Sequence, residues 1–103
     1  MMDRIDLEAR DPARNIWRYY TLGIERTLFN DYAVRSMYGR IGETGRHRCY
    51  HFRTLAEARH KYHQLLHKRL HAQSRIGVNY QVVNLSSNTY KAVGFHQSNI
   101  PSP

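Results

Sequence analysis

The sequence has a single cysteine, Cys49, and no apolar run that approaches the length of a membrane span. One cysteine excludes an internal disulfide and a cysteine-based zinc site, and it fits a reducing compartment. A membrane-spanning helix needs about 18 apolar residues, and the segment from Met1 to Pro12 is charged rather than signal-like. We therefore expect a soluble, cytoplasmic protein without a membrane partner.

Acidic residues are also scarce, and none follows Glu57. The chain has 16 Lys+Arg against 8 Asp+Glu, a formal net charge of +8, and four of the eight acids fall in the first eleven residues. A positive field attracts polyanions, because each neutralised phosphate releases condensed counterions. The charge therefore favours a nucleic-acid partner, although a small basic protein can also use its charge for solubility alone.

The types and spacing of the polar residues argue against catalysis and against a metal. The carboxylates after residue 11 are scattered, and no serine has the context of a nucleophile elbow. Cys49 lies between His47 and His51, but residues two apart on a strand are about 6 to 7 Å apart, so we expect a packed thiol rather than a Cys-His pair. We predict a non-enzymatic protein without a cofactor.

Four histidines spaced by three, four and four residues share one side of a predicted helix: His60, His63, His67 and His71. Zinc takes three or four protein ligands, and one helix offers only two good ones at i and i+4. We therefore predict no metal site, and we interpret the histidines as a solvated cationic face.

A length of 103 residues with 41% apolar content fits one domain with one core. Residues 1–15 are polar without sustained periodicity, so we expect a flexible lead-in. Residues 16–83 carry the periodic patterns of the domain. Residues 84–103 are rich in Ser, Asn and Pro, and we expect a partly disordered polar extension in which only Tyr90 to Phe95 forms local structure.

Segments rich in aromatic and β-branched residues predict strands at Ile16 to Ile24, Tyr32 to Tyr38 and His47 to Phe52. Asn30-Asp31 predicts a turn between the first two, and short connections favour antiparallel neighbours. Three glycines in residues 39–45 do not easily stay extended. A further strand is predicted at Asn79 to Val83.

The clearest element is a helix predicted over Leu55 to Ala72. Thr54-x-x-Glu57 is a capping box, in which each side chain accepts from the other residue's backbone N–H. One apolar stripe follows helical spacing: Leu55, Ala58, Tyr62, Leu65, Leu66 and Leu70. The order strand, strand, strand, helix, strand predicts an α+β fold, a small antiparallel sheet of about four strands with one amphipathic helix on one face.

The stretch MYGRIGETG, from Met37 to Gly45, follows neither the dinucleotide fingerprint nor the P-loop pattern. Tyr38-Gly39-Arg40 offers a flat ring, a position without a side chain and a planar five-donor fork, a combination that suits a sugar-phosphate backbone. Alternatively, the glycines serve turn geometry and Arg40 is solvated. The residues alone leave both interpretations open.

The motifs together resemble those of the WGR domain family over Trp17 to about Val83. The family motif W-G-R-I/V-G-x-x-G reads YGRIGETG at residues 38–45, after a strand at LFNDYAV, residues 28–34. Phe52 followed by Leu55-Ala56-Glu57-Ala58 is similar to the start of the family's single helix. Tyr38 stands where the family has its name-giving tryptophan.

The resemblance implies a small antiparallel sheet with one helix, and a domain that helps to bind DNA near a break through its motif aromatic and arginine. We therefore predict a module that binds nucleic acid, DNA in preference to RNA, mainly through the sugar-phosphate backbone. The predicted contact residues are Tyr38, Gly39, Arg40, Arg46, Arg48, Lys61 and Lys68. The rival prediction is a protein-interaction module whose exposed aromatics or edge strand pair with another chain.

Overall fold

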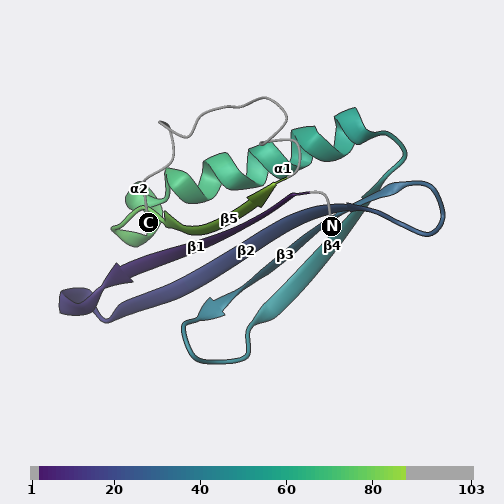
Figure 1. Ribbon diagram of the computed structural model, residues 1–103. Helices are drawn as coiled ribbons and strands as arrows, with labels where there is room; N and C mark the ends of the chain where they lie inside the picture. The colour runs from purple at the N-terminus through teal and green to yellow at the C-terminus, as the bar shows by residue number, and fades with distance from the viewer. Residues whose placement is uncertain (1–2, 88–103) are drawn as a thin grey trace.

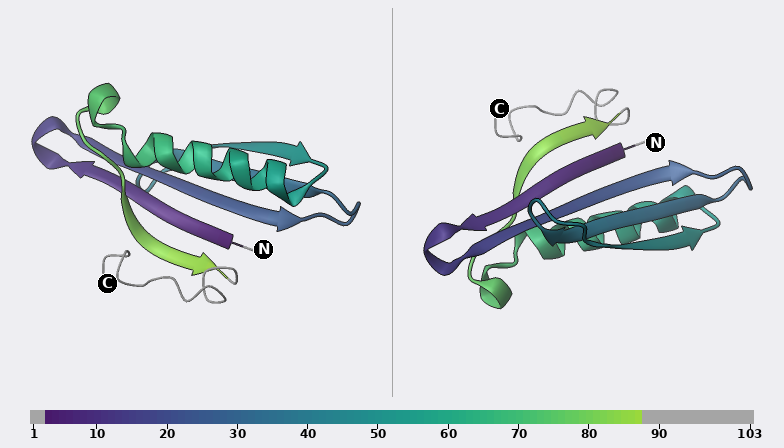
Figure 2. Two further views of the ribbon diagram at one scale, coloured as in Figure 1. Left: turned by 90° about the horizontal axis from the view of Figure 1, so that it is seen from above. Right: turned by 90° about the horizontal axis from the view of Figure 1, so that it is seen from below.

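The computed structural model describes residues 3–87 as one antiparallel sheet with helices on one face (Figure 1). The strands are β1 (Asp3–Asp11), β2 (Ile16–Arg26), β3 (Tyr32–Arg40), β4 (Arg46–Phe52) and β5 (Gln81–Ser87). The helices are η1 (Pro12–Arg14), α1 (Leu55–Leu70) and α2 (Gln73–Ile76). The five strands lie in the order β4-β3-β2-β1-β5, and α1 packs on β2, β3 and β4 (Figure 2). The predicted α+β class with one main helix is confirmed.

The expectation of a flexible segment before Ile16 is wrong, because β1 occupies residues 3–11 and pairs with both β2 and β5. The sheet therefore has five strands rather than about four. Ile5, Leu7 and Ala9 alternate with charged residues, and these three side chains are buried. A strand with one solvated face is polar at every second position, so its composition resembles that of a loop.

The C-terminal strand lies later than predicted. β5 begins at Gln81 and ends at Ser87, so residues 84–87 belong to the sheet rather than to a polar extension. Val82 and Leu85 pack against the core, and Leu85 pairs with Ile5 of β1. The remainder of the predicted extension, residues 88–103 with Tyr90 to Phe95, lies outside the described residues.

Helix α1 begins where the capping box predicts. Thr54 Oγ1 accepts from Glu57 N at 3.2 Å, and Glu57 Oε1 accepts from Thr54 N at 3.3 Å. The helix ends at Leu70, two residues before the predicted end, and its last turn leads directly into α2. Ala58 and Tyr62 are buried, and the leucines of the stripe pack partly buried against the same core.

The strand register determines which side chains lie beneath the helix. Leu7, Tyr20, Tyr38 and Arg46 are directly paired across four adjacent strands. Directly paired residues point to the same face of an antiparallel sheet. Because Leu7 and Tyr20 belong to the core, Tyr38 and Arg46 also lie on the helix-bearing face.

Within residues 3–87, no helix combines the length and the hydrophobicity that crossing a membrane requires.

Candidate functional site

A groove of about 570 Å³ opens on the helix-bearing face, beside α2 and the C-terminal end of α1. Its lining residues are Asn15, Ile16, Trp17, Arg18, Tyr38, Gly39, Arg40, Arg69, Arg75, Ile76 and Tyr80. Four of these residues are arginines, two are tyrosines, and no aspartate or glutamate is among them. The ring of Trp17 lies against Arg10 on the opposite face of the sheet. The groove is therefore a concave, positively charged surface with aromatic walls.

Tyr38 contributes an aromatic ring that is fixed in place. Its ring packs against that of Tyr20, with 6.1 Å between centroids and 29° between planes. Tyr38 is half-buried, so one part of the ring supports the core while another part lines the groove. This packing fixes the ring without help from a ligand.

Arg40 is the last residue of β3 and is paired with Arg18 of β2. Its Nη2 donates to Asn15 Oδ1 at 3.1 Å, and its Nε lies 3.7 Å from Glu43 Oε2. Asn15 follows η1 and has a left-handed backbone with φ of 58°. The turn between β1 and β2 thus orients the Arg40 guanidinium, and Arg18 occupies the paired position on the same face of the sheet.

Arg69 enters the groove from α1. Its guanidinium carbon lies 4.2 Å from the ring centroid of Tyr20 and 6.0 Å from those of Tyr38 and Tyr80. The Nε atom of Arg69 is buried, and nothing in residues 3–87 accepts a hydrogen bond from it. A buried donor without an acceptor is unusual in a folded protein.

The charge of Arg69 also acts on the tyrosine beneath it. Burial raises the pKa of Tyr20, and this effect outweighs the lowering by Ser36 and by the nearby Arg69. The Tyr20 hydroxyl therefore stays neutral at physiological pH and does not neutralise the positive charge of Arg69 beside the groove.

Arg75 belongs to α2, and its Nη2 donates to Lys68 O at 2.7 Å. α2 ends at Gly77, whose φ is 92°, and Arg14 Nη1 donates to Gly77 O at 3.3 Å. These bonds hold the segment after α1 against the β1–β2 end of the sheet, which forms one wall of the groove.

The three glycines of the motif serve the hairpin between β3 and β4. Gly42 has φ of 88°, and Glu43 N donates to Arg40 O at 3.0 Å. Gly39 and Gly45 lie so close that a Cβ on Gly39 would be 2.8 Å from Gly45 Cα. The missing side chains therefore allow the turn and the close approach of the two strands, and Gly39 lines the groove with its backbone.

Arg46 and Arg48 continue the positive surface along β4. Arg46 pairs with Tyr38, and Arg48 pairs with Ser36, so both lie on the helix-bearing face. Hydrogen bonding to the hydroxyl groups of Tyr50 and Tyr38 raises the pKa of Arg48. Arg48 thus links Tyr38 on β3 to Tyr50 on β4.

The two predicted lysines lie outside the groove. Lys61 Nζ lies 4.5 Å from the ring centroid of Tyr50, so it joins the surface made by Arg48. Lys68 is exposed on the last turns of α1 and reaches the groove only through its carbonyl, which accepts from Arg75. The structure therefore brings six of the seven predicted residues to one continuous face and leaves Lys68 apart.

Sequence reasoning missed three groove arginines, Arg18, Arg69 and Arg75. Arg69 had a visible signal, because it lies seven residues after Tyr62 and therefore points in nearly the same direction on the helix. A charged residue in line with an apolar stripe is expected to have an unusual environment. Arg18 had no such signal, because its position opposite Arg40 depends on the strand register.

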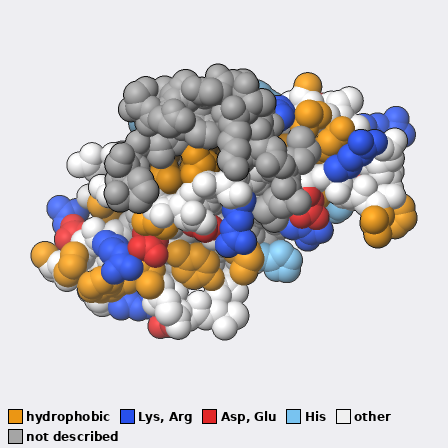
Figure 3. All heavy atoms as spheres, viewed as in Figure 1, with side chains coloured by type: hydrophobic (Ala, Val, Ile, Leu, Met, Phe, Trp, Pro, Cys, Tyr) orange, Lys and Arg blue, Asp and Glu red, His pale blue; other side chains and the backbone are white. Residues whose placement is uncertain are grey.

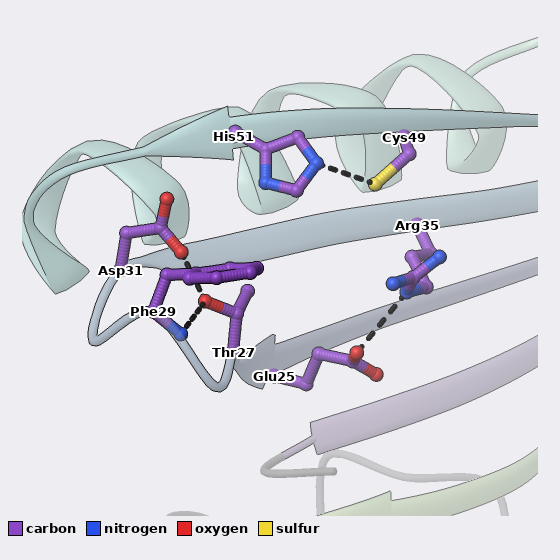
Figure 4. Close-up of polar contacts among 7 residues, drawn as sticks. All are labelled: Glu25, Thr27, Phe29, Asp31, Arg35, Cys49 and His51. Carbon is purple, nitrogen blue, oxygen red and sulfur yellow. Dashed lines mark hydrogen bonds and ion pairs between the residues drawn. The ribbon is translucent and has the colours of Figure 1, made fainter.

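The expectation of a packed Cys49 is wrong, because this thiol is exposed on the face opposite the helix. Its Sγ lies 3.4 Å from His51 Nε2 (Figure 4). The distance of about 6 to 7 Å applies to the backbone positions, and the two side chains lean toward each other over the sheet.

The four histidines predicted on one side of the helix, His60, His63, His67 and His71, are exposed. No group of three metal-binding side chains occurs in residues 3–87.

Comparison with known proteins agrees with this architecture. The model of the WGR domain family matches residues 3–76. A relative titled "Uncharacterized protein y4dW", from Sinorhizobium fredii (strain NBRC 101917 / NGR234), is 43% identical over 49 residues, which are 48% of this chain and 24% of the relative. The matched part is thus about a quarter of that relative's length. No solved structure matches the chain.

WGR domains are nucleic-acid-binding modules and are not catalytic by themselves. The family match covers most of the chain and includes β1, which the motifs alone did not reveal. This chain belongs to the WGR domain family.

Proposed function

We propose that this protein binds DNA, mainly through the sugar-phosphate backbone, with the groove at the centre of the interface. The observation that carries the proposal is the lining of the groove, which has four arginines and no carboxylate. Arginine presents a planar fork of donors that matches phosphate oxygens in pairs. A concave site of this composition suits a phosphodiester better than an uncharged ligand.

The hydrogen bonds of the groove support this proposal. Asn15 accepts from Arg40 Nη2, and Glu43 Oε2 lies 3.7 Å from Arg40 Nε, so these two side chains orient the guanidinium. Arg69 also lines the groove, and its positive charge adds to that of Arg40. Both guanidinium groups are therefore placed to attract a phosphate group in the groove.

The footprint extends along the edge of the sheet. Arg46 and Arg48 lie on β4, and Lys61 extends from α1 toward Tyr50. Successive residues on one face of a strand are about 6.8 Å apart, which is close to the spacing of phosphates along an extended backbone. Phosphate contacts carry no base code directly, so we expect weak sequence preference.

The test is a fluorescence anisotropy titration of a labelled blunt or nicked duplex at several salt concentrations. The groove variant combines Arg40→Ala with Arg46→Ala. The matched control combines Arg4→Ala with Arg35→Ala, which removes the same charge from the opposite face of the sheet, where both arginines pair with carboxylates. Both pairs of substitutions are at exposed positions.

We expect the groove variant to lose affinity by about tenfold or more at low salt, and the slope of log K against log salt to fall by nearly 2, because each phosphate contact contributes about 0.9. The control should change affinity by less than about threefold, since screening weakens distant charges. Absence of binding by the unmodified chain at low salt, or equal losses in both variants, would contradict the proposal.

A protein-interaction module that does not bind nucleic acid is the alternative, and one observation favours it. Leu28 and Phe29 are 100% and 89% exposed at the connection between β2 and β3, where hydrophobic side chains project from the end of the molecule (Figure 3). The turn is well ordered, because Phe29 N donates to Thr27 Oγ1 at 3.1 Å and Thr27 Oγ1 donates to Asp31 (Figure 4).

This alternative predicts a different result in the same titration. DNA binding would be weak with a shallow salt slope, and Leu28→Ser with Phe29→Ser would abolish capture of a protein partner. Retention of a captured partner by that variant would contradict the alternative.

A further inference from the structure

Strand β4 is an edge of the described sheet that has neither a bulge nor a proline. It lies at the end of the strand order and has one partner among the described residues, β3, with seven consecutive residue pairs and no register shift. The segment Arg46–Phe52 contains neither proline nor glycine. The opposite edge differs, because β5 pairs with β1 through a register shift between Asp6 and Leu7. Bulges of that kind discourage pairing between edges, whereas a regular edge permits it.

We propose that two copies of this chain pair β4 to β4 in an antiparallel arrangement centred on Cys49. Cys49 is the middle residue of the seven, so a two-fold axis at this point pairs the whole strand with its copy. Arg46 then faces Phe52 of the second copy, and Arg48 faces Tyr50 of the second copy. His47 faces His51 of the second copy on the other side of the sheet.

The side chains favour this register over its neighbours. Directly opposed side chains of an antiparallel pair interact strongly, and like charges at such positions are destabilising. In the register centred on Cys49, each arginine of β4 meets an aromatic ring, a contact that arginine favours. A shift of two residues in one direction places Arg48 opposite Arg48 of the second copy. A shift of two residues in the other direction places His47 opposite Arg53 of the second copy.

The same type of contact already occurs within the chain. Lys61 lies over the ring of Tyr50, and Arg69 lies over the ring of Tyr20. Cys49 is exposed, and its contact with His51 lies on the sheet face rather than at the edge, so it leaves the strand edge open.

Pairing about this axis keeps the same face of the sheet upward in both copies. In one chain α1 lies on one face of the sheet (Figure 2). In the pair the two sheets become one continuous sheet, and both α1 helices lie on the same side of it. Arg46, Arg48 and Lys61 from each copy then border a common trough between the helices. Each chain carries a net charge of +8, so the copies repel at low salt and associate more strongly as salt screens that repulsion.

This salt dependence is opposite in sign to that of DNA binding. Pairing of β4 does not depend on nucleic-acid binding, and it is tested without nucleic acid.

The experiment uses the full chain with Cys49→Ser, to which either His47→Cys or His51→Cys is added. All three positions are exposed, and circular dichroism verifies that each variant is folded. The two variants, one carrying a size tag, are mixed in equal amounts in about 0.5 M sodium chloride to screen repulsion. Copper-phenanthroline with dissolved oxygen accepts the electrons and protons that disulfide formation releases.

Directly opposed residues have Cβ atoms about 4.5 to 5.5 Å apart, near the range that a disulfide joins. Two copies of the same variant have their cysteines four residues out of register, about 13 Å apart. The proposal therefore predicts that the mixed dimer exceeds either same-variant dimer by about tenfold or more. Random collision would give a ratio of about two, because each same-variant dimer forms half as often as the mixed dimer.

Sedimentation equilibrium of the unmodified chain is the second measurement. We expect the dimer fraction to increase with salt between about 0.1 M and 0.5 M. A random ratio of crosslinked products, or a chain that stays monomeric across that range, would overturn the proposal.

Discussion

The guanidinium of Arg69 lies over the ring of Tyr20, with 4.2 Å between the guanidinium carbon and the ring centroid. This contact buries the Nε of Arg69, for which residues 3–87 provide no acceptor. A charged side chain is thus held among aromatic rings at the edge of a positively charged groove. A buried donor without an acceptor costs stability.

Arg69→Met should separate stability from binding. Methionine retains the packing on Tyr20 and removes the buried donor. The stability lost with the cation–π contact and the stability gained by removing the unsatisfied donor should nearly cancel, so the free energy of unfolding should change by less than about 1 kcal/mol. Thermal unfolding measures the stability, and duplex anisotropy measures the binding, which should weaken by about tenfold. An unfolding temperature well below that of the unmodified chain, or an unchanged affinity for the duplex, would contradict the role assigned to Arg69.

Two glycine substitutions test the account of the hairpin. A Cβ on Gly45 would collide with the Tyr38 carbonyl oxygen and the Tyr19 hydroxyl, so Gly45→Ala should destabilise by about 3 kcal/mol. Gly42 has φ of 88° with open space around it, so Gly42→Ala should cost only about 1 kcal/mol. Urea unfolding of both variants measures the difference. Equal losses of stability in the two variants would show that the close approach of β3 and β4 is not the reason for a glycine at position 45.

Asp6 joins three strands on the face opposite the helix. Burial alone would raise the pKa of Asp6, but hydrogen bonds from Asn84, Thr21 and Arg4 outweigh it and lower the pKa. Because the folded-state pKa is lowered, the stabilisation is present above the ordinary value near 3.8 and is lost as the pH falls through the lowered value.

Asp6→Asn should therefore reduce stability at neutral pH by about 1 kcal/mol and flatten the acid limb of the stability curve below about pH 4. Thermal unfolding between neutral and acidic pH measures this effect. Glu8→Gln is the matched control, since it removes an exposed pair with Arg10 and should change stability little. An unchanged acid limb in Asp6→Asn would refute this role.

Much of the fold followed from local patterns. The capping box located the start of α1 at Leu55, and the aromatic segments located β2, β3 and β4. β1 was missed because its charged positions dominate the composition, although Ile5, Leu7 and Ala9 follow the period of a half-exposed strand. The signal of this strand was its alternation of apolar and charged residues rather than its composition.

The candidate site was predictable only in part, for the same reason. Tyr38, Gly39 and Arg40 are contiguous, so the motif brought them together before the fold was known. Arg18 and Arg75 reach the groove from segments 57 residues apart in sequence, and strand register and the turn after α1 decide their positions. Long-range geometry of this kind leaves no local signal in the chain.

An amide chemical-shift map on titration with a short duplex detects DNA binding and locates the bound surface in one experiment. We expect shifts concentrated at Trp17 and Arg18, at the Tyr38 motif, and around Arg69 and Arg75. Residues of the opposite sheet face, such as Arg35 and Cys49, should stay unchanged. Shifts confined to that face or to the Leu28-Phe29 turn, or no shifts at low salt, would contradict the claim.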